Sequence, residues 1–199
     1  MKATIMIRAF TIFSKMNFLK LSDLQLFLQA VQDFSTKSLP CPCCGAKHPT
    51  WRFHASYERY LISYEKGVRV CFLITITRWI CSSCSHTHAI LPEILIPHSS
   101  YSLFFILRLL REYYLETYSV ATLCDKYQIS ISTLYGWKKL FLLHKKLWLG
   151  ILEDSIASSA GFLSQIPSIH TSDFLRAFFL IQGYSFLQGV SKTTRSGFS

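Results

Sequence analysis

Four cysteines in two closely spaced pairs are the residues of this sequence best suited to chemistry. Cys41 and Cys44 form one pair, Cys81 and Cys84 form the other, and each pair has two residues between its thiols. That spacing lets both thiolates of a tight turn point at one ion, while backbone N–H groups of the turn stabilise the sulfur atoms. Two such turns supply the ligands of a tetrahedral four-sulfur site. The pairs therefore predict a structural Zn²⁺ site.

The first cluster holds a third cysteine, so its ligands need an argument. A pairing that uses Cys43 would leave one residue or none between the ligands, whereas Cys41 with Cys44 leaves Gly45 just after the second ligand. A turn of this kind often needs a positive φ there, which glycine adopts freely. We therefore expect Cys43 to be a spare thiol. The segment between the pairs, residues 45–80, exceeds the roughly 15–20 residues of compact sites, but loop-closure entropy grows only logarithmically.

The remaining candidate ligands have simpler interpretations. His86 and His88 could each replace a cysteine, but four thiolates already suffice, so we expect these histidines at the surface or facing phosphate. Cys71 and Cys124 are expected to be small core residues. A closed shell of four thiolates leaves no open position for water, and a catalytic zinc is therefore not expected.

A β-hairpin is expected to join the two pairs. Hydrophobic residues alternate with other residues from Val68 to Ile76, which is typical of a strand. The aromatic segment Phe53 to Tyr64 is its expected partner, and Glu65-Lys66-Gly67 would reverse the chain. The hairpin would bring the two cysteine pairs together.

Helical periodicity predicts the other elements. A short helix from about Asp23 to Phe34, with Ser22 as its N-cap, precedes the cysteines. After Pro97 a helix carries Leu103, Ile106, Leu107, Leu110 and Tyr114 on one side, with Ser99, Ser100 or Ser102 as its cap. Further helices are expected over Val120 to Tyr127, Ile131 to Leu147 and Asp173 to Leu187, the last weakened in its middle by Gly183.

These elements predict an α+β chain in four parts. A small four-cysteine zinc-ribbon β-hairpin domain is followed by a helical helix-turn-helix domain and a C-terminal apolar helix. The expected parts are an N-terminal segment with a short helix (1–39), the zinc ribbon (40–98), the helix-turn-helix (99–148), and a linker, C-terminal helix and tail (149–199). Within the last part, the Ser-rich stretch 155–172 is the expected linker and 191–199 the expected tail.

The segment from Ser119 to Phe141 is the candidate DNA-binding element. Its apolar residues have the spacing by which a short helix, a tight turn and a second helix bury a common core. Hydroxyls in the first turn of the second helix could meet phosphates or base edges in a major groove, and lysines further along could neutralise phosphates. The alternative is an ordinary amphipathic helix pair with a solvated lysine face. The candidate DNA-binding residues are Ser130, Ser132, Thr133, Tyr135, Lys138, Lys139, Lys145 and Lys146.

The composition favours a polyanionic partner. Lys and Arg number 21 against 11 Asp and Glu, which gives a net charge of +10. Half of the residues are hydrophobic and 16% are charged, which excludes a disordered chain. None of the longest apolar stretches has the roughly 20 apolar residues of a membrane span. The apolar N-terminus resembles a signal peptide, but Arg8, Lys15 and Lys20 interrupt it and no small-residue cleavage site follows. With seven cysteines, an odd number, and no secretion signal, we expect a cytoplasmic, nucleoid-associated protein with metal rather than disulfides.

The combined motifs resemble a known class of proteins. The resemblance is carried by Cys41-Pro42-x-Cys44-Gly45, then His54 and Arg59, then the run from Arg78 through Cys81-x2-Cys84-x-His86-Thr87-His88 to Pro92, and then the STLYGWKK segment. Together these are similar to the zinc-ribbon plus helix-turn-helix proteins associated with bacterial transposable elements, over roughly Pro40 to Leu147, and Phe174 to Leu187 also looks similar. The resemblance implies a DNA-recognition module like the N-terminal part of a transposase.

Two positions depart from that pattern. Ser85 stands where the second turn commonly has glycine. Gly136 stands where such recognition helices usually carry Arg or another long polar residue, which removes a base or phosphate contact and costs the helix up to about 1 kcal/mol.

The sequence does not have the motifs of a transposase catalytic domain or of other common enzyme classes. A metal-dependent transposase needs three carboxylates on a ribonuclease-H-like sheet to hold two ions. Glu153, Asp154 and Asp173 follow the helix pair, but they lie in a segment of about fifty residues that has no strand pattern and cannot build such a sheet. No G-x-S-x-G, P-loop or G-x-G-x-x-G motif is present. We expect a non-catalytic protein that binds double-stranded DNA. The alternatives are an adaptor that docks a transposase or a second copy of itself through the ribbon and C-terminal helix, and a remnant of a larger transposase.

Overall fold

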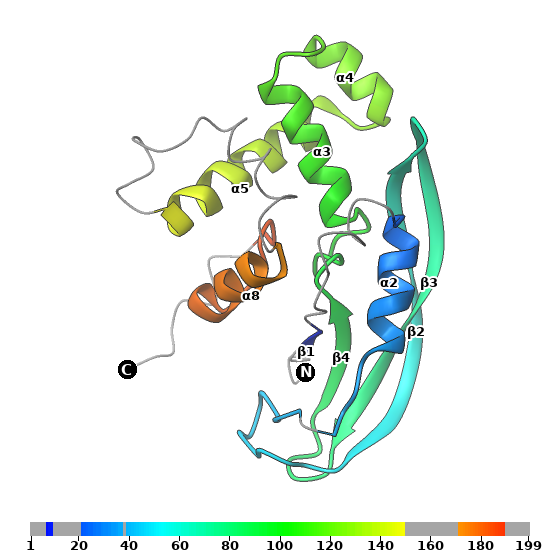
Figure 1. Cartoon of the computed structure of the whole chain (residues 1–199), viewed down its shortest axis with the longest axis vertical. Coiled ribbons are helices and arrows are strands. Elements are labelled where there is room, and N and C mark those ends of the chain that lie inside the picture. The colour runs from blue at the N-terminus through cyan, green and yellow to red at the C-terminus, as the bar shows by residue number, and fades with distance from the viewer. Residues whose placement is uncertain (1–6, 10–20, 38, 150–170, 190–199) are drawn as a thin grey trace.

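The computed structural model of the chain describes residues 7–9, 21–37, 39–149 and 171–189. Its sheet has the strand order β1-β4-β3-β2, in which β1 (Ile7–Ala9) runs parallel to β4 (Thr87–Pro92) and the other neighbours are antiparallel. Helix α2 (Asp23–Gln32) lies along the sheet, and α3 (Leu103–Tyr114), α4 (Val120–Tyr127) and α5 (Ile131–Leu149) gather at one end (Figure 1). The described chain is therefore mixed α and β.

The predicted hairpin is present and is longer than expected. Strand β2 (Trp51–Glu65) pairs with β3 (Val68–Cys81) from Glu65 opposite Val68 to Trp51 opposite Cys81. Lys66 and Gly67 make the reversal, both at positive φ, as a tight two-residue hairpin turn requires. The pairing register shifts once, between Phe53 and Ala55. The hairpin thus runs from the helical end of the molecule to the cysteine turns (Figure 1).

Three hydrophobic cores lie along the hairpin. The first packs its turn end, through Ile62 and Tyr64, against α3, α4 and α5. The second packs Leu26 and Phe27 of α2 against the middle of the hairpin and β4. The third surrounds the cysteines and includes Trp51. Because the first core contains residues on both sides of the boundary predicted at residue 98, the hairpin and the helices share apolar packing, and the division into parts stays a prediction.

The N-terminal helix forms where its sequence predicts. Ser22 caps α2 by accepting a hydrogen bond from Gln25 N, and the Gln25 side chain accepts one from Ser22 N, which makes a capping box. Asp23 in the first turn accepts hydrogen bonds from the hydroxyls of Ser63 on β2 and of Ser102, the N-cap of α3. One carboxylate therefore ties α2, β2 and the start of α3 together.

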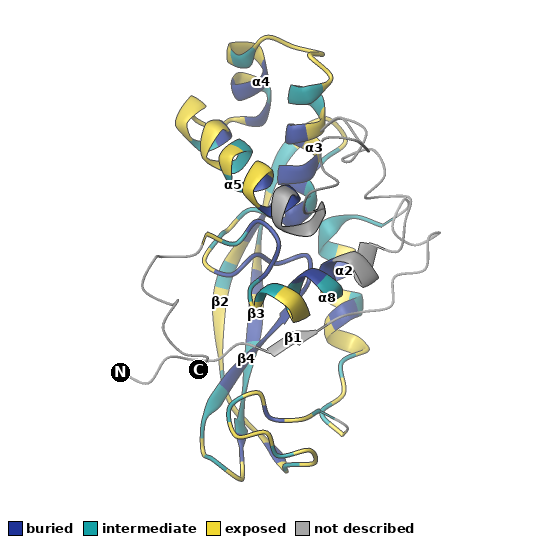
Figure 2. Ribbon diagram, turned by 90° about the vertical axis from the view of Figure 1, so that its left-hand side faces the viewer, coloured by how far each residue is buried: buried dark blue, intermediate teal, exposed yellow. Residues whose placement is uncertain are grey.

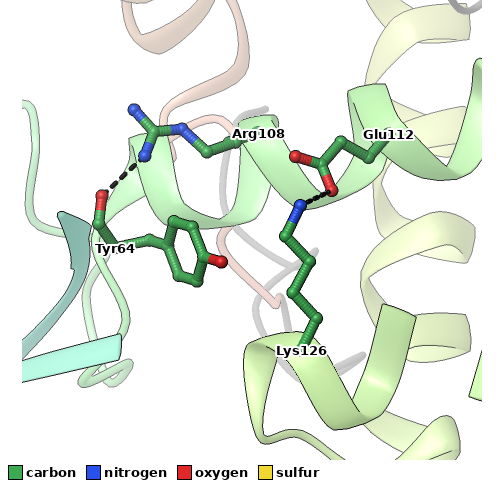
Figure 3. A network of polar contacts seen from close by, with 4 residues as sticks. All are labelled: Tyr64, Arg108, Glu112 and Lys126. Atoms are coloured by element: carbon green, nitrogen blue, oxygen red, sulfur yellow. Dashed lines mark hydrogen bonds and ion pairs between the residues drawn. The ribbon is translucent and has the colours of Figure 1, made fainter. Parts of the chain in front are cut away.

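A polar network fixes the hairpin turn against the helices (Figure 3). Arg108 of α3 donates to the backbone oxygen of Tyr64 at 2.6 Å, and Lys126 of α4 pairs with Glu112 of α3 at 2.8 Å. The Tyr64 ring stacks on Tyr127 with centroids 4.5 Å apart. The end of β2 is consequently held by both helices.

Strand β4 was not predicted. The run Thr87–Pro92 pairs with β3 through Arg78 opposite Ala89 and is almost entirely buried (Figure 2). Residues 88–92 are all buried and include the apolar run Ala89 to Pro92, so β4 lacks the alternation by which β3 was recognised, because both of its faces are covered. The predicted surface position of His88 is wrong for the same reason, since that side chain is 0% exposed.

Two further predictions need correction. Cys71 is exposed rather than in a core, because it shares a face of β3 with exposed Leu73 and Thr75, whereas Cys124 is buried as predicted. Helix α8 (Thr171–Gln182) ends earlier than expected. Gly183 adopts φ +72° and donates its N–H to Phe179 O, so this glycine terminates the helix rather than weakening its middle.

Several predictions fall outside the described residues. These are residues 1–6 and 10–20 of the N-terminal segment, the linker up to residue 170 and the tail from residue 191, whereas strand β1 (Ile7–Ala9) is described and was not predicted. No helix in the described part of the chain has the length and apolar character needed to cross a bilayer.

Buried His144 predicts that the folded protein loses stability in acid. It lies among Phe178, Tyr184 and Phe186, and its Nδ1 accepts a hydrogen bond from Leu187 N at 2.8 Å. Burial lowers its pKa from 6.5 to about 4. As the pH falls, the unfolded chain therefore takes up this proton before the folded chain does. The free energy of unfolding should decrease as the pH is lowered from 6.5 to about 4, by up to about 1.4 kcal/mol per pH unit. Denaturant unfolding at several pH values measures this.

Matched variants isolate the contribution of this histidine. Replacing His144→Gln keeps an acceptor for the Leu187 N–H but removes the titrating imidazole. The slope of the free energy of unfolding against pH should therefore become shallower. Replacing the exposed His54→Gln should leave the slope unchanged. An unaltered slope in His144→Gln would show that this side chain does not cause the acid sensitivity.

Candidate functional site

The hairpin brings the four predicted cysteines together. Cys41, Cys44, Cys81 and Cys84 place their sulfur atoms within 4.8 Å of one another. The Cys41 and Cys84 sulfurs are 3.7 Å apart, and those of Cys44 and Cys81 are 4.0 Å apart. A tetrahedral site with metal–sulfur bonds of about 2.3 Å has sulfur–sulfur edges of about 3.8 Å. The cluster could therefore hold a metal ion with little rearrangement.

The two cysteine turns have the same backbone pattern. Gly45 N donates to Cys41 O and Ser85 N donates to Cys81 O, each at 2.9 Å. Gly45 at φ +71° and Ser85 at φ +57° are both left-handed. In each turn, backbone N–H groups donate to the sulfur of the first cysteine: those of Cys43 and Cys44 to Cys41, and those of Ser83 and Cys84 to Cys81.

The hairpin base fixes the turns relative to each other. Thr50 and Ser82 exchange hydrogen bonds across the base, with Thr50 N donating to Ser82 Oγ and Ser82 N donating to Thr50 O. Trp51 Nε1 donates to Leu39 O at 3.0 Å, which anchors the chain entering the first turn. Because Trp51 pairs with Cys81 in the ladder, the strand register itself sets the separation of the turns.

The thiols have divergent pKa values that favour a bound cation. Burial raises the pKa of Cys81, but backbone N–H groups and neighbouring thiols outweigh it and bring that pKa to about 7. At Cys84 the His86 N–H lowers the pKa, but burial and the three other sulfur atoms raise it to about 12. One thiolate forms readily, and further ionisation is opposed by crowding unless a positive ion compensates it.

His88, which the sequence interpretation considered as a ligand but preferred to place at the surface, lies in this site. Its Nε2 lies 3.6 Å from Cys41 Sγ, and its ring meets Trp51 edge-on with centroids 5.3 Å apart. A histidine at this distance can hydrogen-bond to a ligand sulfur without binding the metal itself, and so orient that sulfur. Its position in an apolar run that directly follows a cysteine pair was the available signal.

A second candidate site is the exposed start of α5. Ser130 Oγ accepts a hydrogen bond from Thr133 N and lies 2.8 Å from the hydroxyls of Ser132 and Thr133. Tyr135 and Ile131 are also exposed, at 45% and 50%. Three hydroxyls and two large side chains therefore gather at this helix end, away from the core.

The four predicted lysines occupy different environments. Lys139 is exposed, whereas Lys138 donates to Tyr113 Oη at 2.8 Å and lies over that ring. Lys145 is only 5% exposed, because its turn of α5 faces the protein next to buried His144, so the structure does not present it to a phosphate and its contact with DNA stays a prediction. Lys146 lies in α5, but its side chain is outside the described residues.

Fold and site together define a mixed α and β protein with a four-cysteine candidate metal centre at the base of a hairpin. Residues 41–137 match the model of a family described as a domain of unknown function (DUF6431). The matched range includes both cysteine turns, the hairpin, α3, α4 and the exposed start of α5. No curated protein and no solved structure matches the chain.

The left-handed residues of the two turns predict opposite effects of substitution. Replacing Ser85→Gly should raise the free energy of unfolding by about 0.5–1 kcal/mol. A residue with a side chain costs about 1–2 kcal/mol in the left-handed region, and glycine removes this cost, but its greater entropy in the unfolded chain offsets part of the gain. Replacing Gly45→Ala should lower it by about 1 kcal/mol, although an added Cβ meets nothing within 4 Å. Denaturant unfolding of metal-loaded protein, followed by tryptophan fluorescence, measures both. Equal stability of all three proteins would contradict the assignment of strain.

Proposed function

We propose that this chain is a non-catalytic, zinc-containing DNA-binding protein that acts as a transposase-like recognition module of a mobile element. The observation that carries the proposal is the exposed start of α5, where hydroxyl groups, Ile131 and Tyr135 face solvent on a helix whose opposite side is buried. Hydroxyls can bind phosphates or base edges, and apolar side chains can contact thymine methyl groups.

The arrangement of α4 and α5 supports a helix-turn-helix. Ser119 caps α4, and Gln128 ends it at φ +51° with its N–H donating to Cys124 O and Asp125 O. Three residues then connect it to α5. Buried Leu123, Cys124 and Leu134 lie in one core with Tyr127. A short helix, a tight turn and a second helix with a common core are what this motif requires.

The charge distribution supports contact with DNA at α5 more than along the hairpin. The net charge is +10. On the hairpin, Arg59, Arg69 and Arg78 donate hydrogen bonds within the protein, to Ser99 O, Gln128 Oε1 and Thr87 Oγ1. Lys139 is exposed, one helical turn from Tyr135. It is therefore the described cation best placed to neutralise a phosphate beside the exposed start of α5.

Zinc is the metal best suited to the cysteine cluster. Sulfur separations of 3.7 and 4.0 Å fit a tetrahedral ion, and four thiolates select zinc in structural sites. Four sulfur ligands would leave no position for a reacting water, which supports a structural role. In this proposal the cluster forms a zinc ribbon with the hairpin, and the ion stabilises the base of the hairpin.

One observation favours a second function. Leu180 and Ile181 on α8 are 70% and 68% exposed, and Leu73 and Tyr60, which pair across the hairpin, are each 57% exposed. Apolar side chains of this size are common in protein interfaces. An adaptor that docks a transposase or a second copy would use these surfaces and would not need DNA.

DNA binding predicts a steep dependence on salt that involves Lys139. Affinity for duplex DNA, measured by fluorescence anisotropy, should fall steeply between about 50 and 200 mM salt. Replacing Lys139→Ala should weaken binding about five- to ten-fold and make the slope of log affinity against log salt shallower by about 1. Replacing Lys66→Ala, an exposed lysine at the hairpin turn, should change little if α5 is the contact.

A gain-of-function variant completes the DNA test. An added side chain at Gly136 has open space, because a Cβ there meets nothing within 4 Å. Replacing Gly136→Arg should therefore tighten binding, as a cation is added beside the phosphate-facing residues. Absence of DNA binding at low salt, or identical affinities of all these variants, would remove the DNA proposal and favour the adaptor.

Zinc removal predicts loss of the hairpin base. Replacing Cys81→Ser should abolish stoichiometric zinc and unfold the cysteine turns, because metal binding at such sites supplies roughly 10 kcal/mol or more of folding free energy. Replacing the exposed Cys71→Ser should leave the zinc content unchanged. Metal analysis and thiol reactivity measure both variants. A parent protein that contains no zinc, and in which the thiols of Cys41, Cys44, Cys81 and Cys84 all react, would contradict the site.

A further inference from the structure

A second group of metal donors lies against the four-cysteine cluster. Cys43, Cys84 and His86 place one ligand atom each within 4.8 Å of one another, and all three side chains are half-buried. Cys84 belongs to both groups. Cys43 and His86 are not needed by a four-thiolate site, so two donors remain beside it without an assigned role.

The same turns that position the first group position the second. Cys43 lies inside the first turn, where its N–H donates to Cys41 Sγ. His86 follows the second turn, where its backbone oxygen accepts from Cys81 N at 3.0 Å. Its Nδ1 lies 3.1 Å from Cys84 O. In the tautomer with the proton on Nδ1, this hydrogen bond orients the ring and leaves the Nε2 lone pair for a metal, as is usual for ligating histidines.

The chemistry of a zinc tetrathiolate favours a second cation. Four thiolates around one divalent ion leave a net charge of −2, and a thiolate sulfur retains lone pairs after binding one ion. Cys84 can therefore bridge two ions, with Cys43 and His86 completing the ligands of the second. Thiolate with imidazole is a donor set suited to Zn²⁺ and its softer analogues rather than to Mg²⁺ or Ca²⁺.

We propose that Cys43, His86 and a bridging Cys84 bind a second thiophilic divalent ion beside the structural zinc. The proposal rests on the proposed zinc centre, because Cys84 is shared. Three protein donors with solvent as the fourth ligand bind less tightly than four thiolates. The second ion is consequently exchangeable, whereas the first is retained.

Zinc stoichiometry of the full chain, without an affinity tag, tests this directly. Reduced protein is dialysed against excess Zn²⁺, and bound metal is measured by mass spectrometry. We expect two zinc ions per chain, falling to one in Cys43→Ser and in His86→Gln. The matched controls Cys71→Ser and His48→Gln replace an exposed cysteine and an exposed histidine outside the group and should retain two.

The possible results separate the two proposals. One zinc ion in the parent, or two in both Cys43→Ser and His86→Gln, overturns the second site while leaving the four-thiolate centre intact. A parent without zinc overturns both. Cadmium NMR of protein loaded with ¹¹³Cd reports the bridge: two mutually coupled resonances are expected, and one resonance, or two uncoupled ones, contradicts the sharing of Cys84.

Discussion

Four sulfur atoms held within 4.8 Å of one another are the constraint on which the base of this structure depends. Thiols so close together cannot all ionise in the absence of a cation, and the opposed pKa shifts of Cys81 and Cys84 express that conflict. The two turns share one hydrogen-bond pattern and one left-handed residue each. A metal ion would remove the repulsion and lock both turns, which is why a structural ion suits this position better than a disulfide or an apolar core.

The hairpin carries this constraint to the other end of the molecule. Its ladder begins with Trp51 opposite Cys81 at the cysteine turns and ends with Glu65 opposite Val68 beside α3 and α4. There Tyr64 stacks on Tyr127, and Arg108 binds the Tyr64 backbone oxygen. The exposed start of α5 is thus supported by a continuous ladder and core. In the proposed function, this support would orient α5 on DNA.

Local signals in the sequence were sufficient for much of the fold. The cysteine spacing, the strand alternation from Val68, and Ser22 as a helix cap all correspond to what is observed. The misses have a common cause, since they depend on which face of an element is covered by distant residues. His88 and Lys145 are buried and Cys71 is exposed because of tertiary packing, which periodicity within one segment does not reveal. The second donor group was missed because Cys43 and His86 are far apart in sequence and meet only through the hairpin. The helix-turn-helix and the likeness to transposase modules remain predictions.

The most direct test of the metal centre is X-ray absorption spectroscopy at the zinc edge on protein loaded with one equivalent of Zn²⁺. The proposed zinc centre predicts a first shell of four sulfur atoms at about 2.3 Å. A first shell dominated by nitrogen and oxygen, or zinc that does not remain bound, would contradict the central proposal that Cys41, Cys44, Cys81 and Cys84 form one structural zinc site.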